Sequence, residues 1–294
     1  MNPPAASWRF DAIGTRWQID SAAVLDDTAR ARIGALIDGF DREWSRFRPD
    51  SLVSALAARG GEVRAPVDAT PMLDLYADLS DATAGAVNPL VGEALARRGY
   101  DAEYSLVDRG AVPAPTAWRE LVGWHSGILH VAEAVTLDVG ALGKGRLVDR
   151  VAALVRALVP GGVTVDAGGD LAVRGRTERV ALEHPYDPTR AVGVWEIADA
   201  ALCASAVNRR AWPGRDGEGL HHVLDARTGR PVQTVAATWA SALDAMTADA
   251  VATALFFDGG PAFAARHGAD WVRMATDGSI EWSPDCSATL FIRR

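Results

Sequence analysis

Residues 137–173 read LDVGALGKGRLVDRVAALVRALVPGGVTVDAGGDLAV. This stretch runs from an apolar strand through a glycine-rich turn into a helix, and then into two more strands. The helix is predicted over residues 146–158, and its apolar face consists of side chains at three- and four-residue spacing, Leu147, Val151, Leu154 and Leu158. Pro160 and the two glycines after it end the helix. Strands follow at 163–167 and 171–173.

Apolar periodicity and turn residues predict the other elements in the same way. A helix is expected over 27–47. Another begins at Thr70, which we expect to cap it, with Pro71 in its first turn, and it continues to Gly85. Residues 86–123 are rich in turn signals and should hold loops and short helices. The remaining expectations are two short strands within 8–20, a strand pair over 127–137, strands at 179–183 and 192–197, a last helix over 245–257, and terminal strands at 271–275, 279–282 and 289–293.

The mixed order of strands and helices indicates an α+β fold. The sequence shows neither a regular alternation of strand and helix nor an internal repeat of fixed period. No linker rich in Pro, Gly or Ser divides the chain, so we expect a single domain over residues 1–294, with mixed or antiparallel sheets and packed helices. A chain of 294 residues can bury roughly 75% of its unfolded surface, so its core needs no metal or disulfide.

The composition argues against several classes of protein. Lys and Arg number 30 against 38 Asp and Glu, so the formal net charge is −8, which disfavours binding to nucleic acid. Two cysteines, Cys203 and Cys286, are too few for a disulfide framework. No run approaches the ~18 apolar residues of a membrane span, and the first residues lack the cationic and apolar parts of a signal peptide. As the sequence stands, we therefore expect a cytoplasmic protein without a membrane span.

The turn at 138–145 is the first candidate for chemistry. Its glycines let backbone amides approach an anion, the start of the next helix adds a positive partial charge, and Lys144 supplies a mobile cation. A phosphate or pyrophosphate is the natural ligand of such a turn. It is not a Walker loop, because Gly145 follows the lysine and Asp138 stands where the first glycine would be. The alternative is a tight strand-to-helix turn with a solvated lysine.

Two further motifs leave their role open. Gly168-Gly169-Asp170 follows an apolar strand, and it suits either close backbone contact with a ligand or an ordinary hairpin turn. His221 and His222 lie next to each other beside a predicted strand. His222 is a candidate general base or anion partner, and the alternative is a structural hydrogen-bonding role.

The helix predicted over 245–257 carries a pair of oxygen donors. Asp249 and Thr253 are four residues apart, so they lie on one face of the helix. A carboxylate and a hydroxyl suit a hard cation such as Mg²⁺, which shares its other positions with water and substrate phosphates. The alternative is that Thr253 bonds back to a helix carbonyl while Asp249 faces solvent.

Taken together in chain order, these motifs resemble the ApbE family of FAD:protein FMN transferases. The matching segments cover nearly the whole chain: Ile13-Gly14-Thr15, SRFRPDS at 45–51, GAVNPL at 85–90, LDVGALGKG at 137–145, Gly168-Gly169-Asp170, HVLDARTG at 222–229 and ADAVAT at 248–253. Each segment is common alone, but their combination is specific. The resemblance implies an ApbE-like, T-fold-like domain and the Mg²⁺-dependent transfer of FMN from FAD to a Ser or Thr hydroxyl of an acceptor protein, with release of AMP.

The resemblance also implies roles for individual residues. Asp249, Thr253 and the backbone carbonyl of Ala141 would bind the metal, and His222 would be the catalytic base. Phe47 takes the place of a tyrosine that the family sets against the flavin or adenine ring. The residues implied to contact FAD are Ile13, Phe47, Ala86, Val87, Asn88, Asp138, Lys144, Gly168, Gly169 and Val223.

Several positions depart from the family pattern. Ala204 and Ala206 flank a serine where the family has Thr-Ser-Gly, Ala57 lies where an asparagine is usual, and Val87 replaces an aromatic residue. The metal and phosphate elements are intact, so these changes predict altered substrate handling, for example for a particular acceptor protein. The same residues also permit two other functions, hydrolysis of FAD to FMN and AMP, or FAD binding without turnover.

Overall fold

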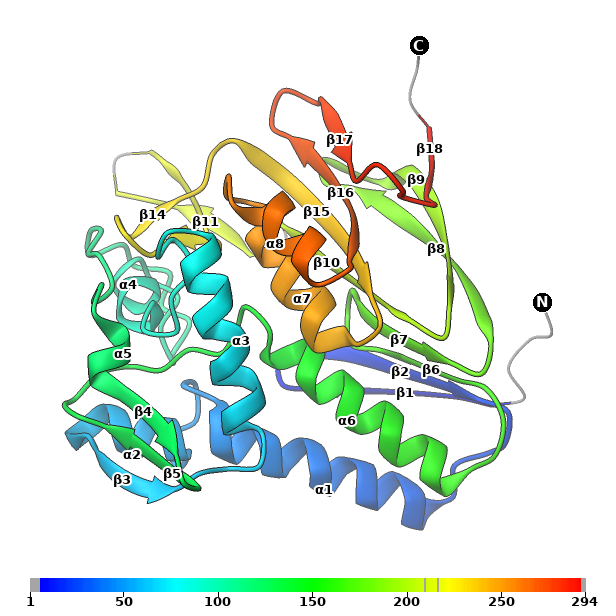
Figure 1. Cartoon of the computed structure of the whole chain (residues 1–294), viewed down its shortest axis with the longest axis horizontal. Helices are drawn as coiled ribbons and strands as arrows, with labels where there is room; N and C mark the ends of the chain where they lie inside the picture. Colours follow the sequence, from blue (N-terminus) through cyan, green and yellow to red (C-terminus); the bar gives the residue numbers. More distant parts are fainter. Residues whose placement is uncertain (1–5, 209, 216, 292–294) are drawn as a thin grey trace.

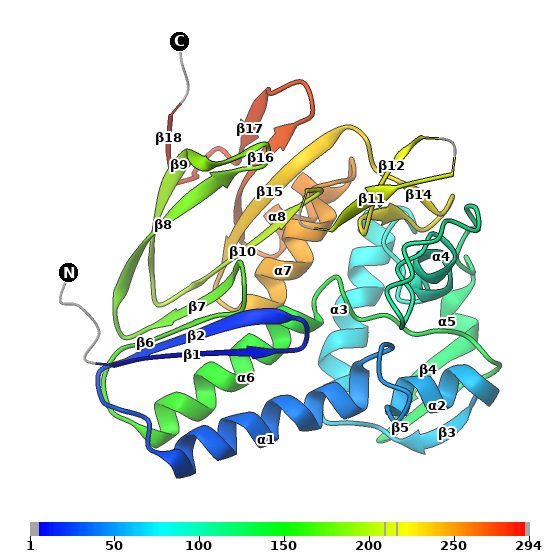
Figure 2. The same cartoon turned by 180° about the vertical axis from the view of Figure 1, so that it is seen from behind.

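The computed structural model describes residues 6–208, 210–215 and 217–291, and its largest element is an eight-stranded sheet (Figures 1 and 2). The strand order is β1-β2-β6-β7-β10-β15-β16-β17, and every neighbouring pair is antiparallel. The strands are β1 (Ala6–Ala12), β2 (Thr15–Ser21), β6 (Val163–Asp166), β7 (Asp170–Arg174), β10 (Ala201–Ala206), β15 (Val235–Ala242), β16 (Asp270–Ala275) and β17 (Ile280–Trp282).

Helices cover one face of this sheet and bury the larger core against it (Figure 1). They are α1 (Asp27–Trp44), α6 (Gly143–Leu158), α7 (Ala245–Ala254) and α8 (Gly260–Arg266), and α3 (Ala69–Ala82) packs against α7 and α8. Helix α1 illustrates the local causes. The carboxylate of Asp26 caps it by accepting from the Ala29 N–H, and its buried face includes Ile33, Ile37 and Phe40.

A long hairpin packs on the opposite face of the sheet. It consists of β8 (Thr177–His184) and β9 (Asp187–Ala198), and the short strand β18 (Thr289–Leu290) pairs with β9. Trp195 of the hairpin and Trp239 of β15 belong to one buried cluster there. The middle of the large sheet is therefore buried on both sides, by helices and by this hairpin.

Shorter elements gather beside the large sheet and helix α3 (Figure 2). They are α2 (Leu52–Arg59), α4 (Gly92–Arg97), α5 (Trp118–Leu121), a sheet of β3 (Gly61–Arg64), β5 (Ile128–Val131) and β4 (Val122–His125), and the pairs β11 (Ala211–Pro213) with β12 (Gly219–His221) and β13 (Leu224–Asp225) with β14 (Arg230–Pro231). A small cluster that includes Leu95, Trp212 and Leu224 joins α4 to these hairpins.

The α+β class with antiparallel sheets and packed helices is confirmed, but several boundaries differ from the predicted ones. Helix α3 begins at Ala69, and Thr70 does not cap it. The preceding residue, Asp68, makes no cap hydrogen bond either, because its buried carboxylate accepts from Arg146 and Arg150 instead. Helix α1 ends at Trp44, helix α6 begins three residues earlier than predicted, at Gly143, and the strand pair expected over 127–137 lies at β4 and β5.

Several elements were not predicted, and the longest of them are α2, α8, β10 and β15. Helix α7 is consequently not the last helix, since α8 follows it. The strand expected over 289–293 is seen as β18, and residues 292–293 lie outside the described part of the chain.

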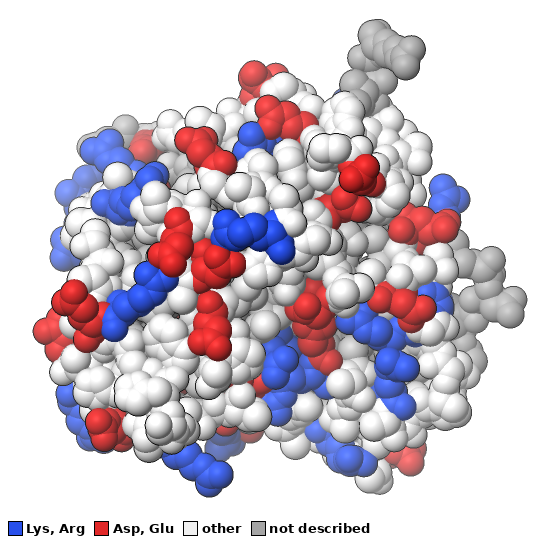
Figure 3. Space-filling view, in the orientation of Figure 1, with Lys and Arg blue, Asp and Glu red and all other residues white. Residues whose placement is uncertain are grey.

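No helix in the described part of the chain is long and apolar enough to cross a membrane. On the face shown in Figure 3, Lys and Arg side chains are interspersed with Asp and Glu.

Candidate active site

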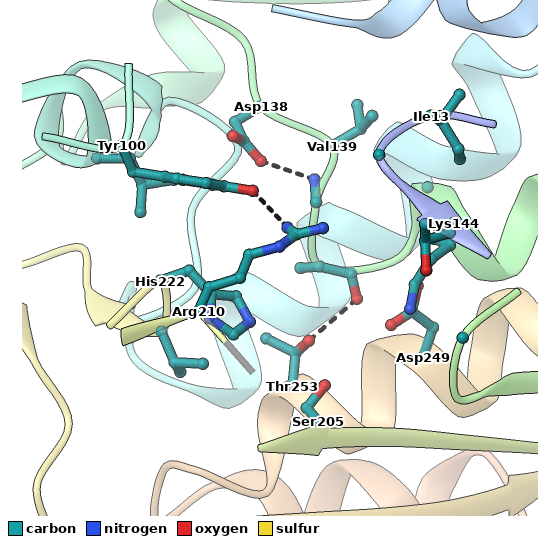
Figure 4. Close-up of a pocket in the computed structure, with 18 of the residues that line it drawn as sticks. Ile13, Tyr100, Asp138, Val139, Lys144, Ser205, Arg210, His222, Asp249 and Thr253 are labelled. Atoms are coloured by element: carbon teal, nitrogen blue, oxygen red, sulfur yellow. Dashed lines mark hydrogen bonds between the residues drawn. The ribbon is translucent and has the colours of Figure 1, made fainter. Parts of the chain in front are cut away.

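The turn at residues 138–145 meets helix α7, which lies more than 100 residues further along the chain (Figure 4). The Gly145 N–H donates to Asp249 Oδ2 at 2.9 Å, and the Thr253 hydroxyl donates to the Ala141 carbonyl at 3.2 Å. Asp249 is therefore turned inward and 4% exposed, and Thr253 reaches across to the turn. We call the turn together with Asp249 and Thr253 the floor of the site.

Two local features bring the floor together. A Cβ on Gly145 would lie 2.1 Å from the Ala245 carbonyl oxygen, so only glycine lets α6 and α7 approach this closely. Tyr76 of α3 holds the turn in place through two hydrogen bonds. Its hydroxyl donates to the Asp138 carbonyl at 2.9 Å and accepts from the Ala141 N–H at 3.2 Å. Periodicity alone indicates Tyr76 only as a core residue, so this role could not be found from the sequence.

Lys144 lies among buried carboxylates. Its Nζ is 3.0 Å from Asp170 Oδ2, and Asp170 is 1% exposed. Burial alone would lower the pKa of Lys144, but Asp170 and Asp249 outweigh it and raise that pKa. Burial, together with the charge of Asp170, raises the pKa of Asp249 well above its usual value. The Lys144 ammonium of the floor thus lies close to two buried carboxylates, that of Asp249 in the floor and that of Asp170 beside it.

The donor set at the floor suits magnesium. Among the described residues, no group of three or more His, Cys, Asp or Glu side chains gathers at metal-binding distance. The floor offers instead one carboxylate, the Ala141 carbonyl and the Thr253 hydroxyl, and the last two are already within 3.2 Å of each other. All of these are hard oxygen donors, and so few protein ligands leave positions for water and phosphate oxygens, as Mg²⁺ requires. The residues present therefore fit the ion.

The two neighbouring histidines have different surroundings. The His221 ring is held by the Val232 carbonyl at 2.8 Å and the Val223 N–H at 3.3 Å, which is a structural role. His222 lines the cavity beside Arg210 (Figure 4), and its Nδ1 is buried without a hydrogen-bond partner among the described residues. Burial, followed by the charges of Arg210 and His221, lowers the pKa of His222 to about 3. The ring is therefore neutral near pH 7.

Asp138 is engaged with protein groups rather than open to a ligand. Its Oδ2 accepts from Arg46 Nε at 2.5 Å, and its Oδ1 accepts from the Gly140 N–H at 2.7 Å. The Arg46 side chain is 5% exposed and also donates to the Tyr100 carbonyl. The sequence places Arg46 only inside a family-like segment, and nothing in its spacing indicates this ion pair. A ligand that contacts Asp138 would therefore bind a carboxylate that is already paired with Arg46.

A single cavity of about 1200 Å³ contains every residue that the sequence singles out as a site residue. These residues are Ile13, Phe47, Ala86, Val87, Asn88, Asp138, Ala141, Lys144, Gly168, Gly169, His222, Val223, Asp249 and Thr253. Among the other lining residues, which the sequence did not single out, are Arg46, Tyr76, Tyr100, Tyr104 and Arg210. Tyr100 and Tyr104 lie in the turn-rich segment after α4, where no periodic pattern marks a side chain as facing the cavity.

Two of the expected contact residues also have structural tasks. The Asn88 side chain donates to the Pro115 carbonyl and accepts from the Leu90 N–H, so it holds its own loop. Gly168 has φ +67°, and a Cβ there would lie 2.2 Å from Thr15 Oγ1, so it permits close packing of the β1–β2 turn. Gly168 thus forms the turn between β6 and β7 and lies at the cavity edge, and its contact with a ligand stays a prediction.

A model of the ApbE family matches residues 13–272. The chain belongs to the ApbE family. Two curated relatives are named FAD:protein FMN transferase. The one from Rhodobacter capsulatus is 28% identical over 98% of this chain and 58% of its own length, and the one from Treponema pallidum is 29% identical over 72% of this chain and 66% of its own length. The chain thus spans less than two thirds of either relative.

Solved ApbE structures share the fold of this chain. The ApbE protein of Thermotoga maritima superposes with a TM-score of 0.80 at 23% identity, over 95% of this chain and 97% of that one. The flavin transferase ApbE from Vibrio cholerae gives a TM-score of 0.76 at 23% identity, over 95% and 97% of the two chains. At such identities the likeness establishes the fold.

Three of the four positions that depart from the expected ApbE pattern lie in the lining of the cavity. Ala204 and Ala206, both in β10, line the cavity, as does Val87. Ala57 lies in α2 and is not among the lining residues. The departures therefore lie mainly in the cavity lining, and β10, which carries two of them, packs against α7.

Proposed function

We propose that the chain transfers FMN from FAD to a Ser or Thr hydroxyl of an acceptor protein, with Mg²⁺ and with release of AMP. The observation that carries this proposal is the floor, where Lys144, Asp249 and Thr253 converge in one cavity. The cavity volume of about 1200 Å³ is sufficient for a dinucleotide. The name of the relatives, FAD:protein FMN transferase, supports the same chemistry.

Pyrophosphate cleavage depends mainly on positioning and on charge neutralisation. In this proposal Asp249, Thr253 and the Ala141 carbonyl hold Mg²⁺, which when bound would neutralise charge on phosphate oxygens. Lys144 adds a positive charge beside the same oxygens. The start of α6 favours an anion as well, because Leu142 gives it no side-chain cap and the helix dipole is positive there.

His222 is the proposed base that takes the proton of the acceptor hydroxyl. Its ring is neutral near pH 7 because burial lowers its pKa, and its Nδ1 has no partner among the described residues. A pKa of about 3 makes a weak base. An anionic diphosphate beside the ring would raise this pKa towards the range in which a general base works best. We therefore expect His222 to become an effective base only in the substrate complex.

The experiment incubates the protein with FAD, Mg²⁺ and a panel of acceptor domains that carry exposed Ser or Thr residues. Transfer gives AMP, detected by chromatography, and a covalently fluorescent acceptor in a denaturing gel. The Asp249→Ala variant should lose at least about 100-fold in rate, because the metal loses its carboxylate ligand. The matched control is Asp277→Ala, since this exposed carboxylate accepts, among the described residues, only from Ser279 of its own turn. Unchanged turnover in Asp249→Ala would show that the proposed metal site is wrong.

Omitting the acceptor separates transfer from the two alternative functions. AMP that forms only when an acceptor is present supports transfer. AMP that forms equally fast without an acceptor would identify an FAD hydrolase, in which water replaces the hydroxyl. Retention of FAD over hours without any AMP would identify a binding protein.

A further inference from the structure

Three aromatic side chains, Phe47, Tyr100 and Tyr104, form one side of the cavity, which we call the aromatic wall. The ring of Tyr104 stacks on that of Phe47, with centroids 5.2 Å apart and planes inclined by 14°. Tyr104 also meets Tyr100 edge-on, with centroids 5.5 Å apart. The three rings are thus packed on one another, and they differ in how much surface each leaves open.

Two of these rings are already covered by protein groups. The guanidinium carbon of Arg46 lies 4.1 Å from the ring centroid of Phe47 and 5.0 Å from that of Tyr100. Tyr100 is only 5% exposed and also lies beneath the guanidinium of Arg210. Tyr104, by contrast, is 49% exposed. Tyr104 therefore presents the largest open aromatic surface of the wall.

The backbone holds Tyr104 at the rim of the cavity. Its φ is +51° and that of Leu106 is +53°, a region that L residues adopt only when their surroundings impose it. The Asp101 carboxylate contributes to this by accepting from both the N–H and the hydroxyl of Ser105. A Cβ added to Gly14, in the turn between β1 and β2, would lie 3.7 Å from the Tyr104 hydroxyl. Tyr104 thus reaches from the aromatic wall to the opposite rim.

We propose that Tyr104 covers one flat ring system of the bound dinucleotide, in the role that the family resemblance gives to Phe47. The proposal rests on the proposed function in taking FAD as the ligand. Isoalloxazine and adenine are both flat aromatic rings with hydrogen-bond acceptors at their edges, and aromatic side chains stack on such rings. Arg46 offers a donor beside the wall, because its Nη2 is buried without a hydrogen-bond partner among the described residues.

The test measures the dissociation constant for FAD from the change in flavin fluorescence, with EDTA present so that no turnover occurs. Tyr104→Ala should weaken binding about fivefold to tenfold, whereas Tyr104→Phe keeps the ring and should stay within about twofold of wild type. Phe47→Leu should weaken binding less than Tyr104→Ala, because Phe47 is already covered by Arg46 and Tyr104. Val107→Ala is the matched control, since Val107 lies in the same loop, is 54% exposed and is not among the lining residues.

Each outcome bears on the proposal. Equal affinity of Tyr104→Ala and wild type overturns it, and so does an equal loss in Tyr104→Phe, which would assign the effect to the hydroxyl. Competition with FMN and with AMP identifies the ring. If Tyr104→Ala weakens the affinity for only one of these two ligands, the proposal is supported. If it weakens both affinities equally, or neither, the proposal is overturned. A wild-type chain that binds no FAD overturns the proposed function as well, so the two failures are distinguishable.

Discussion

The floor of the site and its aromatic wall are built in opposite ways. The floor joins two helices through main-chain groups, the Gly145 N–H and the Ala141 carbonyl. The aromatic wall consists of side chains from segments outside the helices, Phe47 after α1 and Tyr104 after α4. Contacts made by the main chain are part of the fold. Side chains in loops, by contrast, can be replaced with a change in ligand contacts and little change in the stability of the fold. Substitutions in the floor should therefore alter stability and activity together, and those in the wall should alter binding alone.

The largest effect should come from Gly145→Ala in the floor. The added Cβ would lie 2.1 Å from the Ala245 carbonyl oxygen and 2.8 Å from the Asp249 Cβ, so α6 and α7 must separate. We expect the free energy of unfolding to fall by about 3 kcal/mol, at the upper end of overpacking effects. AMP formation should be lost as well, since Asp249 and the turn no longer meet. Urea denaturation and the turnover assay measure the two effects.

Gly34→Ala is the matched control for this substitution. Gly34 lies inside α1, and a Cβ there meets nothing within 4 Å. Alanine favours helix over glycine, so we expect a gain of about 0.5–1 kcal/mol in unfolding free energy and normal turnover. A Gly145→Ala variant that stays as stable as wild type would contradict the idea that the floor is part of the fold.

The next largest effect should come from Lys144→Met. Removing the ammonium leaves Asp170, which is 1% exposed, without the cation that lies 3.0 Å away. An uncompensated buried carboxylate should lower the free energy of unfolding by about 3 kcal/mol. Adding Asp170→Asn should restore about 1–2 kcal/mol of this loss, because the double variant no longer contains an unpaired buried charge. Urea denaturation of both single variants and the double variant, without Mg²⁺, completes the cycle.

An exposed pair provides the comparison for this cycle. Arg42 and Asp38 on α1 are ion-paired at 2.8 Å, but their side chains are 60% and 49% exposed. Arg42→Met should therefore change stability by less than about 1 kcal/mol. Additive effects of Lys144→Met and Asp170→Asn would mean that the two groups are not coupled, and that the ion pair is not part of the floor.

The sequence predicted the floor well because local patterns specify it. The helix after the 138–145 turn has a clear apolar face, and the four-residue spacing of Asp249 and Thr253 places both on one side of α7. Glycine at 145 marks a close approach, although nothing in the sequence says that α7 is the partner. The convergence of turn and helix was inferred from the family resemblance, and the structure shows it. The chemical roles of these residues stay predictions.

Other parts could not be predicted because their determinants are tertiary. Strands β10 and β15 read ALCASA and VAATWASA, with small side chains and no alternation, because the sheet is buried on both faces there. Thr70 was the expected cap of α3, but the helix begins one residue before it, and the Asp68 carboxylate at its start accepts from Arg146 and Arg150 of another helix. Tyr104 lies in a loop whose backbone depends on Asp101, so no periodic signal points it at the cavity.

The smallest expected effect is the pH dependence of stability that His222 causes. It tests whether the part of the cavity around His222 excludes water, as the floor does. Burial lowers the pKa of His222 to about 3, whereas an unfolded histidine titrates near pH ~6.5. Between these values the unfolded chain binds a proton that the folded chain does not. The contribution of this ring to stability is therefore complete above pH ~6.5 and is lost as the pH falls towards 3.

Replacing the ring by Gln should remove this pH dependence. Between pH 7.5 and 5.5, wild type should lose about 1.4 kcal/mol of unfolding free energy more than His222→Gln, measured by urea denaturation with buffer as the only change. His125→Gln, at an exposed histidine of β4, should follow wild type instead. If His222→Gln also follows wild type, the ring must be solvated, and the walls would not exclude water. The difference between wild type and His222→Gln in the stability that they lose between pH 7.5 and 5.5 should shrink when FAD and Mg²⁺ are added. Such a result means that a bound diphosphate raises the pKa of His222, as its proposed role as base requires.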